Sequence, residues 1–277
     1  MKDYSYYDGT IAPYDAITVP LSDRAIFFGE AVYDVMIGRN GKLYQAKEHL
    51  SRLRRNSERL SLPLSSDEEI GEIIQELIRL SGYSEYSIYI QVSGDARHRA
   101  HRGEGKKSNL LITVTQYQSK PALSEIKATV MPDLRYGYCD IKTVNLLPAV
   151  LSINEAAKRG ADVAIFEKDG MVTECSHANI LILNNGKLIT HPLDTEILPG
   201  VMRANLIRKC IERGIEVEER AFPVEELFSA DSVLVTSTTQ FVKVCTEIDG
   251  VRLVNAGIGT AEDLFSSLYS DYLSATC

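Results

Sequence analysis

Hydrophobic residues recur with a helical period at one clear place in the first half of the chain. Residues 66–69 read Ser-Asp-Glu-Glu, which is a capping-box pattern. The apolar residues after it recur three and four positions apart: Ile70, Ile73, Ile74, Leu77 and Ile78. This spacing places them on one face of a helix. We therefore predict an amphipathic helix that begins near residue 67.

A two-residue period follows this helix. Ile88, Ile90 and Val92 alternate with tyrosine and polar residues, which is the pattern of a half-buried strand, and residues 110–117 predict another. Pro121 then interrupts the pattern before a β-like segment at 127–131. At roughly 100–200 residues per domain, this length favours two domains. We predict a small N-terminal α/β domain at 1–120, a linker at 121–127 and a larger C-terminal domain at 128–277.

The second half carries three turn signals between β-branched runs, namely Asp169-Gly170, Asn185-Gly186 and Asp249-Gly250. Each predicts a β-hairpin, so antiparallel sheet should dominate there. Helical patterns at 147–159 and 201–213 end in basic residues and a glycine, as helix C-termini favour, and a third covers about 260–275. The predicted fold class is α+β.

Composition narrows the functional classes. The chain has 30 lysine and arginine residues against 38 acidic ones, a formal charge of −8, which argues against nucleic acid as the main partner. Its first residues lack the apolar stretch of a secretory signal, and no segment has 18 consecutive apolar residues, so we expect a cytoplasmic protein without a membrane partner. The five cysteines are scattered, form no C-x-x-C pair, and predict neither a metal site nor disulfides.

Two features could bind a cofactor, and each also has a plain structural interpretation. Lys142 lies among mostly apolar neighbours before a helix, where a poorly solvated amine can act as an imine-forming nucleophile or simply extend to solvent. Pro199-Gly200 opens the helix at 201, whose first N–H groups could bind phosphate, although every helix has such an end. Hydroxyls at 236–239 follow an apolar strand and could equally form a turn.

Two further features carry charge. Glu174 stands at the head of a strand, where a carboxylate could hold a protonated ring nitrogen or lie solvated at an edge. Residues 97–102 form a dense cationic loop, Arg-His-Arg-Ala-His-Arg. Within it Arg99 and His101, two positions apart, can point the same way and bind a carboxylate. The alternatives are a nucleic-acid patch, which the net charge of −8 argues against, and a solvated charge run without function.

Together with Arg24–Val35 and His49–Leu53, the order of these motifs resembles the class IV (fold-type IV) aminotransferases that use pyridoxal phosphate, from about Asp8 to Gly250. That family has one two-domain fold and includes D-amino-acid aminotransferases, branched-chain L-amino-acid aminotransferases and aminodeoxychorismate lyases. The resemblance implies that the larger C-terminal domain binds the cofactor.

The resemblance also implies roles for single residues. Lys142 would hold the cofactor covalently and shuttle the substrate proton, Glu174 would pair with the pyridine nitrogen, and Leu198 would pack on the ring. Arg52 would bind the phosphate, together with the backbone amides of Val201 and Met202 and the hydroxyls of Ser237 and Thr238. The residues on the substrate side would be Tyr33, Tyr89, Thr239, Arg99 and His101.

Arg99-Ala100-His101 resembles the Arg-x-His carboxylate trap of the D-amino-acid enzymes, which the branched-chain enzymes and the lyases usually lack. It implies ping-pong transamination of D-amino acids such as D-alanine with 2-oxoglutarate or another 2-oxo acid, and a homodimer, since in those enzymes the neighbouring subunit supplies the trap. The two sister activities, and a protein that only binds the cofactor, remain as alternatives. Cys175 and His177 depart from the family pattern beside Glu174 and leave side-chain specificity open.

Overall fold

In the computed structural model, which describes residues 1–95, 99–103, 106–254 and 257–275, helix α3 covers Asp67–Ser81. The capping box at its start is confirmed. Glu69 N donates to Ser66 Oγ at 3.2 Å, and Ser66 N donates to Glu69 Oε2 at 3.1 Å. Ile70, Ile74 and Leu77 are buried on one face of the helix. Local sequence signals therefore set both the start and the packing face of α3.

The chain forms two units. The first contains Met1–Ser119, Ile141–Asn145 and Tyr272–Cys277, and the second contains Lys120–Asp140 and Leu146–Asp271. Segments 141–145 and 272–277 thus differ from the predicted C-terminal domain at 128–277. Backbone pairing explains the first difference, because Tyr33 N donates to Lys142 O at 2.9 Å and Val144 N donates to Ala31 O at 3.2 Å. For the second, the Tyr272 ring packs edge-on against Tyr44 of the first unit.

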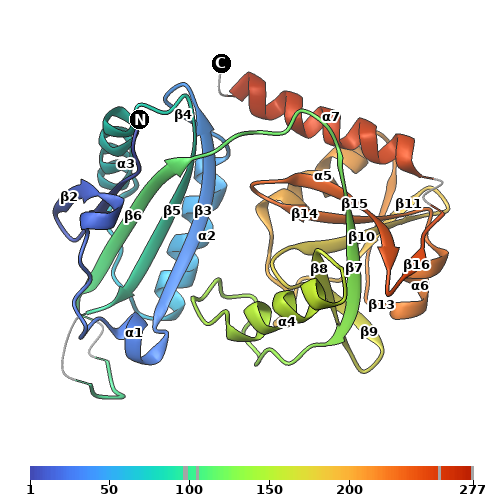
Figure 1. Cartoon of the computed structure of the whole chain (residues 1–277), viewed down its shortest axis with the longest axis horizontal. Coiled ribbons are helices and arrows are strands. Elements are labelled where there is room, and N and C mark those ends of the chain that lie inside the picture. The colour runs from blue at the N-terminus through green and yellow to red at the C-terminus, as the bar shows by residue number, and fades with distance from the viewer. Residues whose placement is uncertain (96–98, 104–105, 255–256, 276–277) are drawn as a thin grey trace. The chain divides into compact units, whose positions relative to one another are not determined.

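The first unit is built on a six-stranded sheet in the order β2-β1-β6-β5-β3-β4, antiparallel at every pairing (Figure 1). Its strands are β1 (Tyr4–Tyr7), β2 (Thr10–Pro13), β3 (Ala31–Arg39), β4 (Lys42–Leu43), β5 (Glu85–Gly94) and β6 (Ser108–Gln116). A 3-10 turn, η1 (Tyr14–Ala16), and helix α1 (Arg24–Phe28) lie between β2 and β3. The two strands predicted at 88–92 and 110–117 are confirmed as β5 and β6.

Helices α2 (Ala46–Arg59) and α3 share one hydrophobic core with β3, β5 and β6. Leu53 of α2, Ile74 of α3 and Ile88 of β5 are all fully buried in it. The hydrophobic pattern did not predict α2, because its buried face also carries polar side chains, His49, Arg52 and Asn56. Both helices therefore cover the same face of this sheet.

The second unit holds a ten-stranded sheet in the order β12-β11-β10-β14-β15-β7-β8-β9-β13, with β16 paired to β15. Its strands are β7 (Ser124–Pro132), β8 (Val163–Lys168), β9 (Met171–Cys175), β10 (Asn179–Asn184), β11 (Lys187–Thr190), β12 (Glu216–Glu219), β13 (Phe222–Pro223), β14 (Ser232–Ser237), β15 (Phe241–Ile248) and β16 (Val251–Arg252). The three predicted hairpins are confirmed as the β8/β9, β10/β11 and β15/β16 pairs. Antiparallel pairing dominates, although β7 pairs in parallel with both β8 and β15, and β11 with β12.

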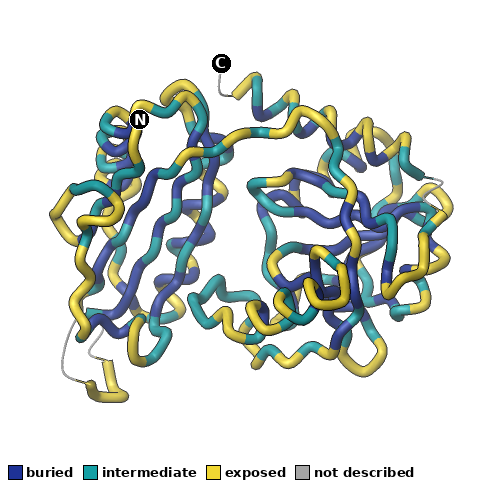
Figure 2. The backbone as a smooth tube through the Cα atoms, in the orientation of Figure 1, coloured by how far each residue is buried: buried dark blue, intermediate teal, exposed yellow. Residues whose placement is uncertain are grey.

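Three described helices lie within the sequence of this unit: α4 (Leu147–Lys158), α5 (Val201–Glu212) and α6 (Val224–Ser229). A fourth, α7 (Ile258–Ala275), belongs to this unit up to Asp271, and its last residues belong to the first unit. Of these four, α4, α5 and α7 confirm the predicted segments within about two residues, the usual uncertainty of helix ends. Figure 2 shows the buried residues concentrated in the strands of each unit. Among the described residues, no helix combines the length and the apolar character that a membrane span needs. The α+β class is confirmed.

Candidate active site

Lys142 lies at the edge of the first unit's sheet. Its backbone pairs with β3, where Val32 and Thr143 form an antiparallel bridge. Its Nζ atom lies 4.5 Å from the centroid of the Tyr33 ring, and the Tyr33 ring stacks on Tyr89 at 5.3 Å. The structure thus brings three of the predicted site residues, Lys142, Tyr33 and Tyr89, together on one face of this sheet.

Arg52, on α2, is 5% exposed and is held by a carboxylate. Its Nε donates to Asp34 Oδ2 and its Nη2 donates to Asp34 Oδ1, both at 2.8 Å. His49 Nδ1 lies 2.8 Å from the same Oδ1 atom. Burial raises the pKa of Asp34, but the Arg52 charge and the hydrogen bonds of His49 and Arg52 outweigh it and hold this pKa well below its ordinary value. Asp34 therefore fixes the guanidinium in place as a permanent ion pair.

The cationic loop is described at residues 99–103, whereas Arg97 and His98 lie outside the described residues. Arg99 and His101 are exposed, and both approach the ring of Phe28. The Arg99 Cζ atom lies 5.6 Å from the ring centroid, and the His101 ring lies 5.4 Å from it. The two side chains predicted to bind a carboxylate are thus gathered around one aromatic ring.

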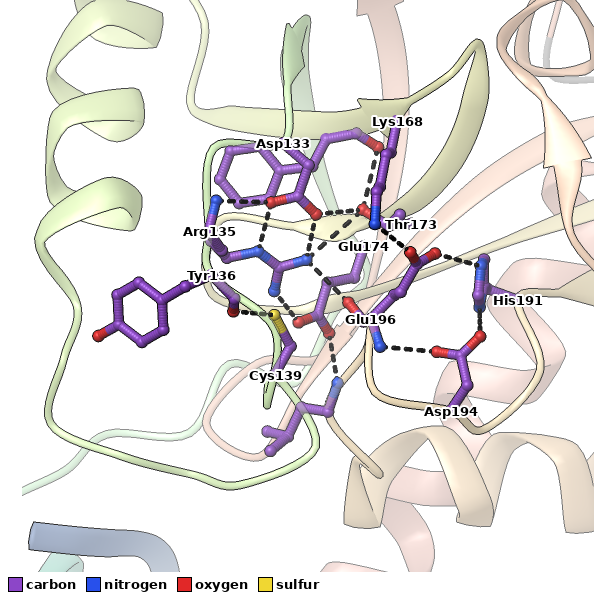
Figure 3. Close-up of polar contacts among 12 residues, drawn as sticks. Asp133, Arg135, Tyr136, Cys139, Lys168, Thr173, Glu174, His191, Asp194 and Glu196 are labelled. Atoms are coloured by element: carbon purple, nitrogen blue, oxygen red, sulfur yellow. Dashed lines mark hydrogen bonds and ion pairs between the residues drawn. The ribbon is translucent and has the colours of Figure 1, made fainter.

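Glu174, at the end of β9 in the second unit, is 6% exposed. Its Oε2 atom accepts hydrogen bonds from Asn179 Nδ2 at 2.9 Å and from Leu198 N at 3.1 Å. Its Oε1 atom contacts Nη1 of Arg135 (Figure 3). The alternative of a solvated Glu174 at a strand edge is therefore wrong, because the carboxylate is buried and accepts hydrogen bonds.

Arg135 links Glu174 to a second carboxylate. Its Nε donates to Asp133 Oδ1 at 2.9 Å and its Nη2 to Asp133 Oδ2 at 2.6 Å, while Nη2 also donates to Glu196 O at 2.9 Å. Burial raises the pKa of Asp133, yet the hydrogen bond and charge of Arg135 bring it below its ordinary value. Counted as ionised, the two carboxylates outnumber the one guanidinium of this largely buried group by one negative charge. It is suited to one further cation.

The N-terminus of α5 lies next to this group. Gly200 is its N-cap and no side chain caps the helix, so its first amides, including those of Val201 and Met202, are available to an anion. Asn179 Nδ2 also donates to Leu198 O at 2.8 Å, which ties the turn before α5 to Glu174. A Cβ atom at Gly200 would lie 2.0 Å from Asn179 Oδ1, so glycine is needed for this close approach.

The predicted hydroxyl residues lie at the end of β14. Ser237 ends the strand, Thr238 and Thr239 are in the turn after it, and all three are half-buried. Gln240 N donates to Ser237 O at 3.3 Å, as expected of a turn. Their predicted binding roles stay predictions, and so do those of the other site residues.

A polar cluster near Glu174 involves His191, Asp194 and Glu196, which place one possible ligand atom each within 4.8 Å of the others. Lys168 Nζ donates to Glu196 Oε1 at 2.6 Å (Figure 3). His191 Nδ1 lies 2.9 Å from Pro192 O. Glu196 N donates to Asp194 Oδ1 at 2.7 Å. We interpret these contacts as the support of the turn that leads to Leu198.

Sequence reasoning missed several residues of these groups, among them Asp34, Arg135 and Asn179. One of them had a usable signal. Asp34 interrupts the apolar run of β3, and a carboxylate in a buried strand is stable only when it is paired. Arg135 follows the end of β7 and Asn179 begins the apolar strand β10, and neither neighbourhood indicates a partner, so only the tertiary structure reveals their contacts with Glu174.

The comparisons with known proteins agree with one another. The family model described as "Amino-transferase class IV" matches residues 31–248. A D-alanine aminotransferase from Bacillus licheniformis is 32% identical over 278 residues, covering 98% of this chain and 97% of its own. A branched-chain amino acid aminotransferase from Escherichia coli has a TM-score of 0.88 at 21% identity, covering 100% of this chain and 96% of its own.

A second solved structure is a branched-chain amino acid aminotransferase from T.th. complexed with N-(5'-phosphopyridoxyl)-L-glutamate. It has a TM-score of 0.86 at 19% identity and covers 98% of this chain and 95% of its own. At these identities the two solved structures show the fold alone. The family model and the sequence relative show more than the fold, because they identify the family of this chain.

Proposed function

This chain belongs to the class IV aminotransferases, and from that premise we propose that it transfers the amino group of small D-amino acids, such as D-alanine, to a 2-oxo acid such as 2-oxoglutarate. The enzyme uses pyridoxal phosphate, as this family does. In the proposed ping-pong cycle, the first 2-oxo acid leaves before the second one binds.

The residues present fit the chemical groups of this cofactor. A lysine amine suits its aldehyde, a buried carboxylate with net negative charge suits its protonated ring nitrogen, and a guanidinium with a helix N-terminus suits its phosphate. When bound, the cofactor supplies an electron-poor ring that stabilises negative charge at the substrate α-carbon. In this proposal Arg52, Val201, Met202, Ser237 and Thr238 hold the phosphate, and Leu198 packs on the ring.

Lys142 would be the catalytic residue. Its Nζ atom would hold the cofactor covalently and, once the substrate amine has displaced it, take the proton from the substrate α-carbon. The pairing of its backbone with β3 supports this role, because that pairing fixes where the lysine side chain begins. Tyr33, 4.5 Å from Nζ, and Tyr89 would line the substrate side, together with Thr239.

Glu174 would keep the ring nitrogen protonated. The contacts from Asn179, Leu198 and Arg135 support this role, since they hold both carboxylate oxygens in place inside the protein. A preorganised carboxylate attracts a ring cation without having to reorganise when it binds. The net negative charge of the group with Asp133 and Arg135 matches the single positive charge of a pyridinium.

The observation that carries the choice of D-substrates is the gathering of Arg99 and His101 at the Phe28 ring. Two cation-capable side chains at one place can hold an α-carboxylate and so decide which face of the substrate α-carbon meets Lys142. Sequence relatives named D-alanine aminotransferases support the same choice. We further propose a homodimer in which each trap serves the partner's substrate.

A half-reaction panel tests the proposal. The cofactor-loaded protein is mixed separately with D-alanine, D-glutamate, L-leucine and L-glutamate, and the absorbance of the lysine-bound cofactor is followed. We expect fast loss of the band with a D-amino acid. Preference for L-leucine would identify a branched-chain enzyme instead, and a band that persists with every amino acid would identify a cofactor-binding protein without this activity.

Arg99→Met provides the residue-level test. We expect it to weaken the use of D-amino acids far more than it weakens cofactor binding, because Arg99 would bind the substrate and not the cofactor. Arg102→Met, in the same exposed loop, is the matched control. Equal loss of substrate use and cofactor affinity in the Arg99 variant would show that this arginine is structural.

A further inference from the structure

A buried arginine, Arg24, holds the loop that carries Arg99 and His101. Arg24 is 6% exposed and is the first residue of α1. Its Nη1 donates to Ala100 O at 2.5 Å and its Nη2 donates to His101 O at 3.0 Å. Two donors of one planar guanidinium thus bind two successive carbonyls of the loop, which fixes the direction of the backbone there.

Arg24 also packs on the aromatic ring that receives the two loop side chains. Its Cζ atom lies 4.5 Å from the centroid of the Phe28 ring, close to the positions of Arg99 and His101 around the same ring. Glu30 forms an ion pair with Arg24 Nε. Because Glu30 offsets its charge and the two carbonyls use its donors, Arg24 acts by its shape more than as a free cation.

Helix α1 gives Arg24 a rigid base. Asp23, its N-cap, is 1% exposed and accepts hydrogen bonds from Ala25 N at 2.8 Å and from three side chains of the sheet. These are the Tyr7 hydroxyl at 2.9 Å, the Ser93 hydroxyl at 2.7 Å and the Asn109 amide at 2.7 Å. The helix is therefore fastened to β1, β5 and β6 at the residue before Arg24.

Two glycines make room for this arrangement. A Cβ atom at Gly94 would lie 2.9 Å from Arg24 Cδ, and one at Gly103 would lie 3.1 Å from Glu30 Oε1. Side chains at either position would press on the arginine or on its carboxylate partner. The close packing on both sides leaves the guanidinium little freedom to turn away from the loop carbonyls.

We propose that Arg24 is a positioning residue that sets the carboxylate specificity of the enzyme by holding the backbone of residues 100–101. The proposal rests on the proposed function, in which Arg99 and His101 bind the substrate carboxylate. Arg24 itself does not touch the substrate. It fixes where the two side chains begin, and Phe28 gives them a common surface on which to rest.

Arg24→Lys tests the geometry while keeping the charge. One ammonium nitrogen cannot reproduce the fork that spans two carbonyls. We expect KM for D-alanine to rise about tenfold, the size of one lost charged hydrogen bond, with kcat and cofactor affinity close to wild type. Arg102→Lys, the same substitution in the exposed part of the loop, is the control and should leave KM unchanged. An unchanged KM in Arg24→Lys would overturn the proposal.

A double-mutant cycle separates positioning from direct binding. If Arg24 acts through Arg99, adding Arg24→Lys to Arg99→Met should raise KM no further, because the trap is already lost. Full additivity of the two effects would mean that Arg24 binds the substrate by itself, and the proposal would be wrong.

A third measurement does not depend on activity. Trypsin cleavage after Arg99 and Arg102 in the folded, cofactor-loaded protein reports how often this loop opens. We expect Arg24→Lys to speed cleavage at both bonds several-fold, and equal rates would again overturn the proposal. If wild-type protein shows no reaction with D-amino acids, the proposed function fails, while the cleavage rates still decide whether Arg24 holds the loop.

Discussion

Replacing Asp34 by asparagine tests how strongly the first unit depends on the ion pair with Arg52. The substitution is nearly isosteric and removes only the carboxylate charge. Asp34 is 1% exposed and Arg52 is 5% exposed, so water cannot compensate the guanidinium that remains. Both Asp34 oxygens accept hydrogen bonds from Arg52. In the variant an amide nitrogen would replace Oδ2, so that two donors, this nitrogen and Arg52 Nε, would face each other.

The expected loss follows from this burial. Breaking a buried ion pair by removing one partner costs about 3–5 kcal/mol, because it leaves an uncompensated charge inside the protein. Both hydrogen bonds of the pair are 2.8 Å long, and each involves a different oxygen of the carboxylate. We therefore expect the free energy of unfolding to fall by about 3–5 kcal/mol. Asp67→Asn, which breaks an ion pair of Arg54 at the surface, should cost a small fraction of that value.

Urea titration of the cofactor-free variants, followed by circular dichroism, measures the difference. The pKa of Asp34 is lowered in the folded state, so its contribution to stability is present above the unfolded value of about 3.9 and is lost as the pH falls through the lower folded value. The gap between wild type and Asp34→Asn should therefore be fully present at pH 7 to 8, where His49 contributes little, and close only in strong acid. A loss below about 1 kcal/mol at pH 7 would refute the reasoning, since that is the size of a surface pair.

Three other predictions concern the second unit. Glu174→Gln should weaken pyridoxal phosphate binding about tenfold, the value of one charge-assisted hydrogen bond, in a cofactor titration; wild-type affinity would contradict the pairing with the ring nitrogen. Gly200→Ala should also weaken cofactor binding, because its Cβ would displace the Asn179 side chain that lies 2.0 Å away; unchanged affinity would mean that the turn adapts. Burial raises the pKa of the Cys139 thiol to about 11, so iodoacetamide should alkylate it slowly at pH 8 and faster only near pH 10–11. Fast alkylation at pH 8 in the folded protein, equal to that in urea, would show that the thiol is not desolvated.

Much of the fold could be predicted from short stretches of sequence. The capping box set the start of α3, three Asp-Gly or Asn-Gly pairs set hairpins, and glycines set the ends of α4 and α5. Each signal acts through neighbours along the chain, where the backbone conformation of a few residues decides the outcome. Helix α2 was not predicted, because the polar residues His49, Arg52 and Asn56 occupy its buried face and interrupt the helical spacing of apolar residues.

The candidate site divides in the same way. Lys142, Glu174, Arg52 and the Arg99–His101 pair could be named from motifs, since their chemistry is visible in the residue types and their order. The residues that hold these side chains in place could not be named from the sequence. Asp34 is 18 positions from Arg52, Arg135 is 39 from Glu174, and Arg24 is 76 from Ala100. Contacts over such separations depend on how strands register and helices pack.

By itself, then, the sequence determined the local elements, the α+β class and the residues able to carry the chemistry. Only the tertiary structure decided that Lys142 pairs with β3 and groups with the first unit, that Glu174 is buried among donors, and that Arg24 holds the loop of Arg99. The physical reason is that a side chain's type limits what it can do, whereas its burial and its partners, which decide what it does, come from distant parts of the chain brought together by packing.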